Sequence, residues 1–590
     1  MEDIIFNDGF NDDWRTAENN DGIILNIKEF VGCKDANREW NSPEKAKALF
    51  LHTYSYESFI YPESLILLGR TGTGKSAIMC RLQEYVNSGK ARDYSFAITI
   101  SYDDILTEIS EMISDYQSIN ISAELKRLMK IFFHTRTMLY IASTSRFETK
   151  DIKNIKSYLS RNGISIENNV GMSSLISRTL RAIKAAGALS GKVGEVAREI
   201  DKITNVIGEF VERGYDEALD EMKRVLSNDN VLILVDSTDE YDLKDIKVLR
   251  CAKALIATCF DFYNNTEKDH VFIKISLPSE IYTMLVDQLP GKQQGNTVVI
   301  QWSSKELIRM IAIRLLESSI HNRFGQKLLR FSNRYEFGDF QEANPKSYDK
   351  ACELLFEILP NECPTSTNLS YHTIHYLIRH TLKKPREMMD VFDYLLTKMY
   401  DENVNMNYFK QFPDDIRKIV HSTQELMINS ALSMYSTTYQ NIPDDCYEIL
   451  HGLKFVFKGR DLKDRLKAAQ AVLEREGYGG VYDQEDIKRI LLESGLVGTL
   501  NRDSLVFIDS DSDDKSRSHT LENSYRIIVA LFEYQVKGRL RLNDDSYYVV
   551  HPMCYEHFEC KVLNQTLVIP ERIDNEEVMN VRIRKVLEGS

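Results

Sequence analysis

Residues 69–76 read Gly-Arg-Thr-Gly-Thr-Gly-Lys-Ser, an order that combines three glycines with a lysine and a hydroxyl. Glycine lets the backbone pass close to an anion, and the first turn of a following helix presents N–H groups to it. Lys75 supplies a cation for the outer phosphates, and the Ser76 hydroxyl is a ligand for Mg²⁺. These residue types in this order predict a loop that binds a nucleoside triphosphate together with Mg²⁺.

The spacing matches GxxxxGK[ST], the pattern called the P-loop or Walker A motif. An apolar run at 65–68 precedes the loop and suits a buried parallel strand, and Ile78, Leu82 and Val86 follow it at helical spacing. A glycine-rich turn without a ligand does not require this strand–loop–helix context, so we favour nucleotide binding. The predicted nucleotide contacts are Gly69, Thr71, Gly72, Thr73, Gly74, Lys75, Ser76 and Ala77.

Carboxylates follow a second apolar run, in the sequence NVLILVDSTDEYD. Asp236 comes at the carboxyl end of the predicted strand 231–235, where open parallel sheets bind their ligands, and we expect it to hold Mg²⁺ through water. Glu240 follows within one short turn and is our candidate to polarise the attacking water, with Asp239 as the alternative base. A merely solvated turn is the competing interpretation of these two acids. The pattern predicts Mg-dependent hydrolysis of a nucleoside triphosphate.

Five apolar runs have the length and composition of strands that position these residues. We expect them to form a parallel five-stranded sheet with helical crossovers, which is an α/β fold of the P-loop NTPase kind. Ser276, toward the end of the fourth run, is a candidate sensor of the γ-phosphate, although a serine at a strand end is more often a turn former. The runs are 65–68, 94–102, 231–235, 270–278 and 296–302.

A long helical insertion separates the second predicted strand from the third. Residues 121–143 and 191–227 each have helical apolar spacing, and the intervening segment contains a loop. The insertion, about 105–228, is either an interface for a partner or a set of helices packed on the core.

Three segments resemble those of STAND and AAA+-related ATPases. Residues 29–40 (EFVGCKDANREW) resemble the segment before the P-loop of AAA+-related ATPases, with Cys33-Lys34 in place of the usual arginine. Residues 236–240 (DSTDE) resemble the DGLDE box of STAND ATPases, and residues 380–396 (HTLKKPREMMDVFDYLL) resemble the sensor-2 segment shared by STAND ATPases and archaeal origin-recognition initiators. The resemblance implies that Arg386 reaches the γ-phosphate from a lid; an arginine on a solvated helix start after Pro385 is the alternative.

The sequence pattern after residue 302 predicts a helical lid and a winged-helix domain. Ser303 is the expected N-cap of a lid helix with Leu307, Ile311 and Leu315 on one face. Helices at 483–500 and 522–536, followed by two strands around the turn 543–546, outline a winged helix. Such domains bind DNA or proteins, and the candidate phosphate contacts are Arg526, Lys537, Arg539 and Arg541. The expected domains are 1–302, 303–440 and 441–590.

Composition limits the function classes. The net charge of −14 argues against indiscriminate binding of nucleic acid by the whole surface. Nine cysteines without a CxxC pair indicate a reducing compartment, and the acidic N-terminus does not resemble a signal peptide. Residues 172–194 carry too much charge for a membrane span, so we expect a cytoplasmic protein without a membrane contact.

Together these features resemble bacterial STAND/AAA+-like P-loop ATPases associated with anti-phage defence loci. The resemblance implies an ATP-dependent molecular switch that uses ATP and Mg²⁺, forms a homo-oligomer and controls a separate effector protein. The alternative is an initiator or loader ATPase that binds duplex DNA through the winged helix, and a further option is a nucleotide-binding scaffold that does not hydrolyse ATP.

Overall fold

The structure, a computed structural model, divides the chain into two compact units. Among the described residues, 54–300 form one unit, the sheet unit, and all others form the second, the lid unit. The described residues are 15–18, 24–27, 30–110, 122–164, 166, 195–237, 241, 245–265, 270–285, 296–320, 333–364, 370–439, 441–475, 484–508, 525–532, 543–561 and 566–570.

The sheet unit contains a five-stranded, all-parallel sheet in the order β4-β5-β6-β3-β7. Its strands coincide with the five predicted apolar runs, which confirms the α/β class and the parallel sheet. They are β3 (Ile66–Gly69), β4 (Phe96–Ser101), β5 (Val231–Asp236), β6 (Val271–Pro278) and β7 (Thr297–Val299). The strands read as continuous apolar runs because helices cover both faces of the sheet.

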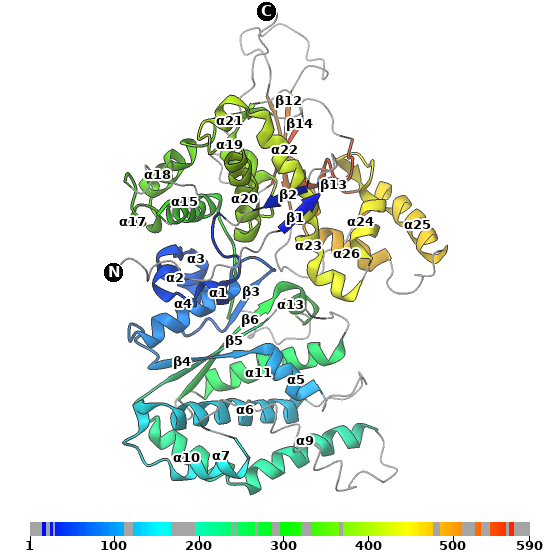
Figure 1. The fold of residues 1–590 in the computed structure, drawn as a ribbon. Coiled ribbons are helices and arrows are strands. Elements are labelled where there is room, and N and C mark those ends of the chain that lie inside the picture. Colours follow the sequence, from blue (N-terminus) through cyan, green and yellow to red (C-terminus); the bar gives the residue numbers. More distant parts are fainter. Residues whose placement is uncertain are drawn as a thin grey trace, which may run out of the picture. The chain divides into compact units, whose positions relative to one another are not determined.

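Right-handed crossovers decide which helix covers which face. Helix α4 (Lys75–Asn87) connects β3 to the edge strand β4, whereas α11 (Ile246–Asn264) connects β5 to β6 in the opposite direction along the sheet. The two helices therefore lie on opposite faces, as Figure 1 shows. Short helices α3 (Tyr54–Ile60) and α13 (Ser279–Leu285) precede β3 and follow β6.

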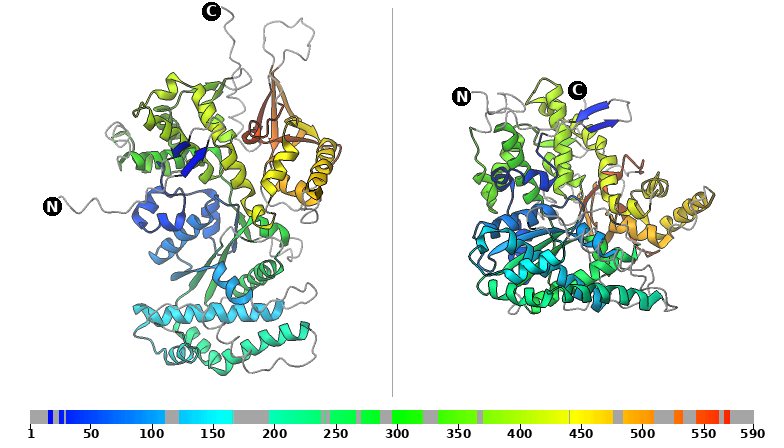
Figure 2. Two further views of the ribbon diagram at one scale, coloured as in Figure 1. Left: turned by 45° about the vertical axis from the view of Figure 1, so that its right-hand side comes forward. Right: turned by 60° about the horizontal axis from the view of Figure 1, so that its bottom comes forward.

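The insertion between β4 and β5 is a helical layer on the face that α11 covers. Helix α6 packs along α11, and α7 and α9 pack against α6 (Figure 2). The segment 191–227 is not one continuous helix, because Gly214 adopts a left-handed conformation with φ of 96° and separates α9 from α10. The helices are α5 (Tyr102–Ser110), α6 (Ser122–Ser143), α7 (Lys153–Arg161), α9 (Glu195–Glu212) and α10 (Tyr215–Val225).

Buried polar contacts hold this layer together. His134 Nδ1 lies 2.7 Å from the Tyr215 hydroxyl, and the hydroxyls of Thr135 and Tyr158 lie 2.9 Å apart. These contacts join different helices, so the described part of the insertion is a packed layer.

The lid unit begins with small N-terminal elements and continues with helices after residue 303. Ser303 caps α15 as predicted: its hydroxyl accepts from Glu306 N at 3.2 Å, and Glu306 Oε2 accepts from Ser303 N at 2.8 Å. The elements are β1 (Arg15–Glu18), β2 (Ile24–Ile27), α1 (Ala36–Glu39), α2 (Pro43–Leu49), α15 (Ser304–Ile320), α17 (Gly338–Gln341), α18 (Pro345–Phe356), β8 (Glu362–Pro364), β9 (Ser370–His372), α19 (Thr373–Arg379), α20 (Pro385–Asp401), α21 (Tyr408–Gln411), α22 (Asp414–Ser422) and α23 (Gln424–Thr438).

The C-terminal part of the lid unit combines helices with a second sheet, in the order β10-β13-β11-β12-β14. All neighbours are antiparallel except β12 and β14, which are parallel. The elements are α24 (Ile442–Leu450), β10 (Val456–Lys458), α25 (Gly459–Arg475), α26 (Gln484–Glu493), β11 (Val497–Ile508), β12 (Tyr525–Leu531), β13 (Tyr547–Val550) and β14 (Thr566–Pro570).

One helix prediction in this region was wrong, and another helix was predicted too long. Within the segment 522–536, residues 525–531 form strand β12 instead of a helix, since their sequence YRIIVAL is rich in β-branched residues. The helix predicted at 483–500 ends at Glu493, because Gly495 adopts a φ of 82° and strand β11 follows. The turn at 543–546 is confirmed by a hydrogen bond from Ser546 N to Asn543 O at 3.2 Å.

No helix within the described ranges is both long enough and apolar enough to cross a bilayer.

Candidate functional site

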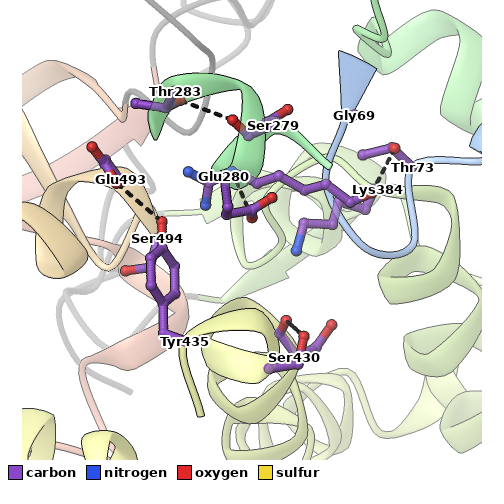
Figure 3. Close-up of polar contacts among 12 residues, drawn as sticks. Gly69, Thr73, Ser279, Glu280, Thr283, Lys384, Ser430, Tyr435, Glu493 and Ser494 are labelled. Atoms are coloured by element: carbon purple, nitrogen blue, oxygen red, sulfur yellow. Dashed lines mark hydrogen bonds and ion pairs between the residues drawn. The ribbon is translucent and has the colours of Figure 1, made fainter. Parts of the chain in front are cut away.

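The loop between β3 and α4 needs its glycines. Gly72 and Gly74 have φ angles of 81° and 94°, a region that side chains with a Cβ rarely occupy. At Gly69 an added Cβ would overlap the Thr73 hydroxyl oxygen, which lies on the same loop (Figure 3). The glycine pattern therefore reflects a left-handed backbone at Gly72 and Gly74 and a close contact at Gly69.

The first turn of α4 offers the geometry of an anion site. The first hydrogen bond within this helix of 13 residues runs from Ile78 N to Gly74 O at 3.1 Å, and the N-cap residue Gly74 has no side chain that could accept from the opening N–H groups. The opening N–H groups of a helix have no carbonyl partner inside it and carry the positive end of its dipole. Ser76 and Ala77 lie in this turn and are half-exposed.

Lys75 folds back over the loop that precedes it. Its Nζ donates to the carbonyl oxygens of Gly69 at 3.0 Å and Arg70 at 3.3 Å, and the residue is buried. Thr73 Oγ1 also donates to the Arg70 carbonyl, at 2.7 Å. In the described part of the chain, the buried Thr71 hydroxyl has no hydrogen-bond partner. Carbonyl oxygens hold the Lys75 ammonium group at the mouth of the loop, and phosphate oxygens would be stronger acceptors for it.

Asp236 is held by a hydroxyl from the adjacent strand. Ser276 Oγ donates to Asp236 Oδ1 at 2.5 Å and accepts from Ser237 N at 3.1 Å. Strand β6 lies between β5 and β3, so it separates the strand that ends in Asp236 from the strand that ends in the glycine loop. Ser276 is fully buried. A buried hydroxyl with this partner orients the carboxylate, a role that suits Ser276 better than contact with a phosphate.

The two candidate bases fall outside the described residues. Asp239 and Glu240 follow Ser237, the last described residue before a short gap, and the structure describes the chain again at Tyr241. Tyr241 is buried, and its hydroxyl donates to Asp103 Oδ1 at 2.7 Å. The choice between Glu240 and Asp239 stays a prediction.

Arg386 lies in the lid unit, as the second residue of α20. Its side chain is partly exposed and forms neither an ion pair nor a hydrogen bond with any residue that the structure describes. The preceding Lys384 is buried and pairs with Glu387 Oε1 at 3.1 Å. Of these cations at the start of α20, Arg386 is the one that remains accessible to an anionic ligand.

Lys34, in the segment 29–40 that resembles the one before the P-loop of AAA+-related ATPases, makes buried ion pairs with α20. Its Nζ lies 2.7 Å from Asp390 Oδ1 and 2.6 Å from Asp393 Oδ2, and all three side chains are buried. Asp393 Oδ1 also accepts from the backbone N–H groups of Phe30 and Val31 at 2.7 and 3.0 Å. Burial opposes the charge on Lys34, but the two carboxylates outweigh it and raise the pKa of the ammonium group. Lys34 therefore fixes the segment 30–34 on α20.

Four of the described basic side chains in the C-terminal region are paired with acids. Arg526 lies on β12, but only its backbone is described, and Lys537, Arg539 and Arg541 lie outside the described residues. The paired side chains are Arg460 with Asp545 at 3.0 Å, Lys463 with Asp544 at 2.9 Å, Lys488 with Glu485 at 2.6 Å and Arg489 with Asp486 at 3.2 Å.

One buried ion pair in the sheet unit was not predicted from the sequence. Arg70, inside the glycine loop, lies 3.7 Å from the carboxylate of Glu280 on α13. The arginine at a variable position of the GxxxxGK[ST] pattern could have indicated that a buried acidic partner lies near the loop.

No protein-family model matches the chain, and no curated protein has significant similarity to it. The functional assignment therefore depends on the glycine loop, the Asp236 strand end and the sensor-2 resemblance of α20.

Proposed function

We propose that the chain is a P-loop ATPase that binds ATP and Mg²⁺ at the loop between β3 and α4. The observation that carries this proposal is the combination of a glycine-walled loop, a lysine held by the carbonyls of that loop, and a carboxylate at the end of β5 in the same parallel sheet. Ligands of open parallel sheets bind beyond the carboxyl ends of the strands, where all of these groups lie.

The donor groups fit a magnesium nucleotide. Mg²⁺ prefers oxygen ligands and is commonly held by one or two protein groups together with phosphates and water. Ser76 and Asp236 supply these oxygens, and the orphaned hydroxyl of Thr71 and the first turn of α4 are suited to phosphate oxygens. Bound Mg²⁺ neutralises negative charge on the phosphates.

Different residues of the chain have separate roles in hydrolysis. Lys75 exchanges its carbonyl acceptors for phosphate oxygens, and Ser276 keeps Asp236 in one orientation. Glu240 aligns and deprotonates the attacking water, with Asp239 as the alternative base. Arg386 stabilises the charge that develops on the γ-phosphate, as the sensor-2 resemblance implies.

We propose that this ATPase acts as a switch. Lys75 and Asp236 belong to the sheet unit, whereas Arg386 and the segment fixed by Lys34 belong to the lid unit. A nucleotide that binds one conformation of the chain better than another would shift the chain toward that conformation. The resemblance extends this to control of homo-oligomerisation or of a separate effector in anti-phage defence.

The C-terminal region supports a winged-helix module. Its core elements occur in the order α24, β10, α25, α26, β11 and β13, and β13 pairs with both β10 and β11. This order of two helices followed by an antiparallel pair favours the winged helix, with β12 as an additional strand. We propose a protein partner for this module, and DNA binding by an initiator-type ATPase is the second candidate function.

The test is ATP turnover by the purified chain in the presence of Mg²⁺. We expect Lys75→Ala and Asp236→Asn to lower kcat at least about a hundredfold, as is typical when charge stabilisation is removed. Lys90→Ala is a matched control, because Lys90 is exposed just beyond the end of α4. Turnover that is unchanged in Lys75→Ala would contradict the proposal, and turnover that rises with duplex DNA would favour the initiator function.

A further inference from the structure

Arg70 is a buried cation inside the phosphate-binding loop. Its side chain is 7% exposed, and the side chain facing it, Glu280, is 4% exposed. A charge that is removed from water to this extent costs free energy unless an opposite charge compensates it. The positive charge of Arg70 and the negative charge of Glu280 therefore compensate each other.

The pair is electrostatic more than hydrogen-bonded. Arg70 Nε and Glu280 Oε1 are 3.7 Å apart, which is beyond hydrogen-bond distance. Arg70 Nε and Nη1 and Glu280 Oε2 have no hydrogen-bond partner in the described portion of the chain. The pair therefore neutralises charge without fixing a tight bidentate geometry.

The position of Glu280 explains why its charge matters. In the parallel pairing of β3 with β6, Gly69 lies opposite Pro278, so Arg70 and Glu280 follow the ends of neighbouring strands. Glu280 lies in the first turn of α13, beside the hydrogen bond from Thr283 Oγ1 to Ser279 O (Figure 3). Its carboxylate is therefore at the edge of the sheet where the glycine loop would hold a polyphosphate.

Like charges repel strongly where water is excluded, because the local dielectric constant is low. We propose that Arg70 is a positioning residue that neutralises Glu280 and thereby keeps the glycine loop able to accept a polyphosphate. This inference rests on the proposed nucleotide binding. In it Arg70 acts through Glu280, and the nucleotide does not need to touch the guanidinium group.

A double-variant cycle tests the pair. The measurement is the Kd of a fluorescent ATP analogue with Mg²⁺ for the full chain, with thermal unfolding as a check on folding. We expect Arg70→Gln to weaken binding about tenfold, which corresponds to about 1.4 kcal/mol. Glu280→Gln should leave the Kd within about threefold of wild type, and Arg70→Gln with Glu280→Gln should restore it to that range.

Two further variants exclude a general structural effect. Arg70→Lys keeps the charge and should bind within about threefold of wild type even if Arg70→Gln folds poorly. Arg213→Gln removes an arginine that pairs with Glu209 at 2.6 Å on the surface of the insertion, and it should not change the Kd.

The outcomes separate this inference from the function on which it rests. A wild-type chain that binds no ATP analogue contradicts the proposed function and this inference with it. Wild-type binding with the same Kd in Arg70→Gln contradicts the inference alone. A double variant as weak as Arg70→Gln also contradicts it, because Arg70 would then act directly on the nucleotide.

Discussion

Single buried residues in the sheet unit hold or compensate the charged groups that follow its strands. Ser276 connects Asp236 with the backbone of Ser237, and Arg70 compensates Glu280. Lys274, two residues before Ser276, donates to the carbonyl oxygens of Phe59, Tyr61 and Ser64 at 2.9, 2.7 and 2.5 Å. Ser276 was a candidate from the sequence, although in a different role. Arg70, Glu280 and Lys274 were not recognised there, since their partners are distant in the chain.

Ser276→Ala should impair catalysis more than binding. The substitution removes the donor to Asp236 and leaves the Ser237 amide without its acceptor, at a cost of about 1–3 kcal/mol for each unsatisfied group. We expect kcat for ATP hydrolysis to fall about tenfold while the Kd for ATP changes little. Thr258→Ala is the control, because the Thr258 hydroxyl donates to Ala254 O within α11. A loss of ATP affinity with unchanged kcat would show that Ser276 contacts the nucleotide instead.

Lys274 should make stability depend on pH. Burial lowers the pKa of Lys274 from 10.5 to about 7. The folded chain has therefore lost this proton at pH values where the unfolded chain still binds it, and the free energy of unfolding rises between about pH 7 and 10.5. We expect thermal unfolding midpoints to show this rise in wild type and to lose it in Lys274→Met. The exposed-site variant Lys90→Met should keep the wild-type profile, and identical profiles in all three would contradict the assignment.

Helix α20 carries Arg386 and also holds the segment 30–34 through two carboxylates. Its first turn carries Arg386, and one face carries Asp390 and Asp393, which hold Lys34. Asp393 also accepts from the amides of Phe30 and Val31. The segment before the sheet unit and the start of α20 are therefore one rigid element of the lid unit.

Lys34→Met should destabilise the lid unit. The variant leaves two buried carboxylates without their cation, and breaking a buried pair in this way costs about 3–5 kcal/mol. The matched control is Lys47→Met, because Lys47 pairs with Glu44, whose side chain is 91% exposed. An exposed pair of this kind contributes about 0–1 kcal/mol. Urea unfolding measures both, and equal losses in the two variants would contradict the assigned role of Lys34.

Local patterns predicted the elements, and long-range contacts escaped prediction. The five sheet strands were readable because each is a continuous apolar run, and the Ser303 N-cap was readable because a cap lies next to its helix in the sequence. Strand β12 was misjudged as a helix because a short apolar run fits both periods. The contact between Lys34 and Asp390 spans 356 positions, a separation that no local pattern encodes.

At the scale of the whole molecule, the two units divide the candidate machinery between them. The sheet unit carries Lys75, Asp236 and the Arg70–Glu280 pair, and the lid unit carries Arg386 and the C-terminal helices and sheet. Each function proposed for the chain requires first that the glycine loop binds a triphosphate.

Calorimetric titration of ATP with Mg²⁺ into the full chain tests that claim most directly. We predict saturable binding of ATP at one site of the wild-type chain. The affinity of Lys75→Ala should be at least about a hundredfold lower, because the charge-assisted hydrogen bonds from Nζ to the phosphates are lost. Lys90→Ala should bind as wild type does. Equal binding by wild type and Lys75→Ala, or no binding by either, would contradict the account.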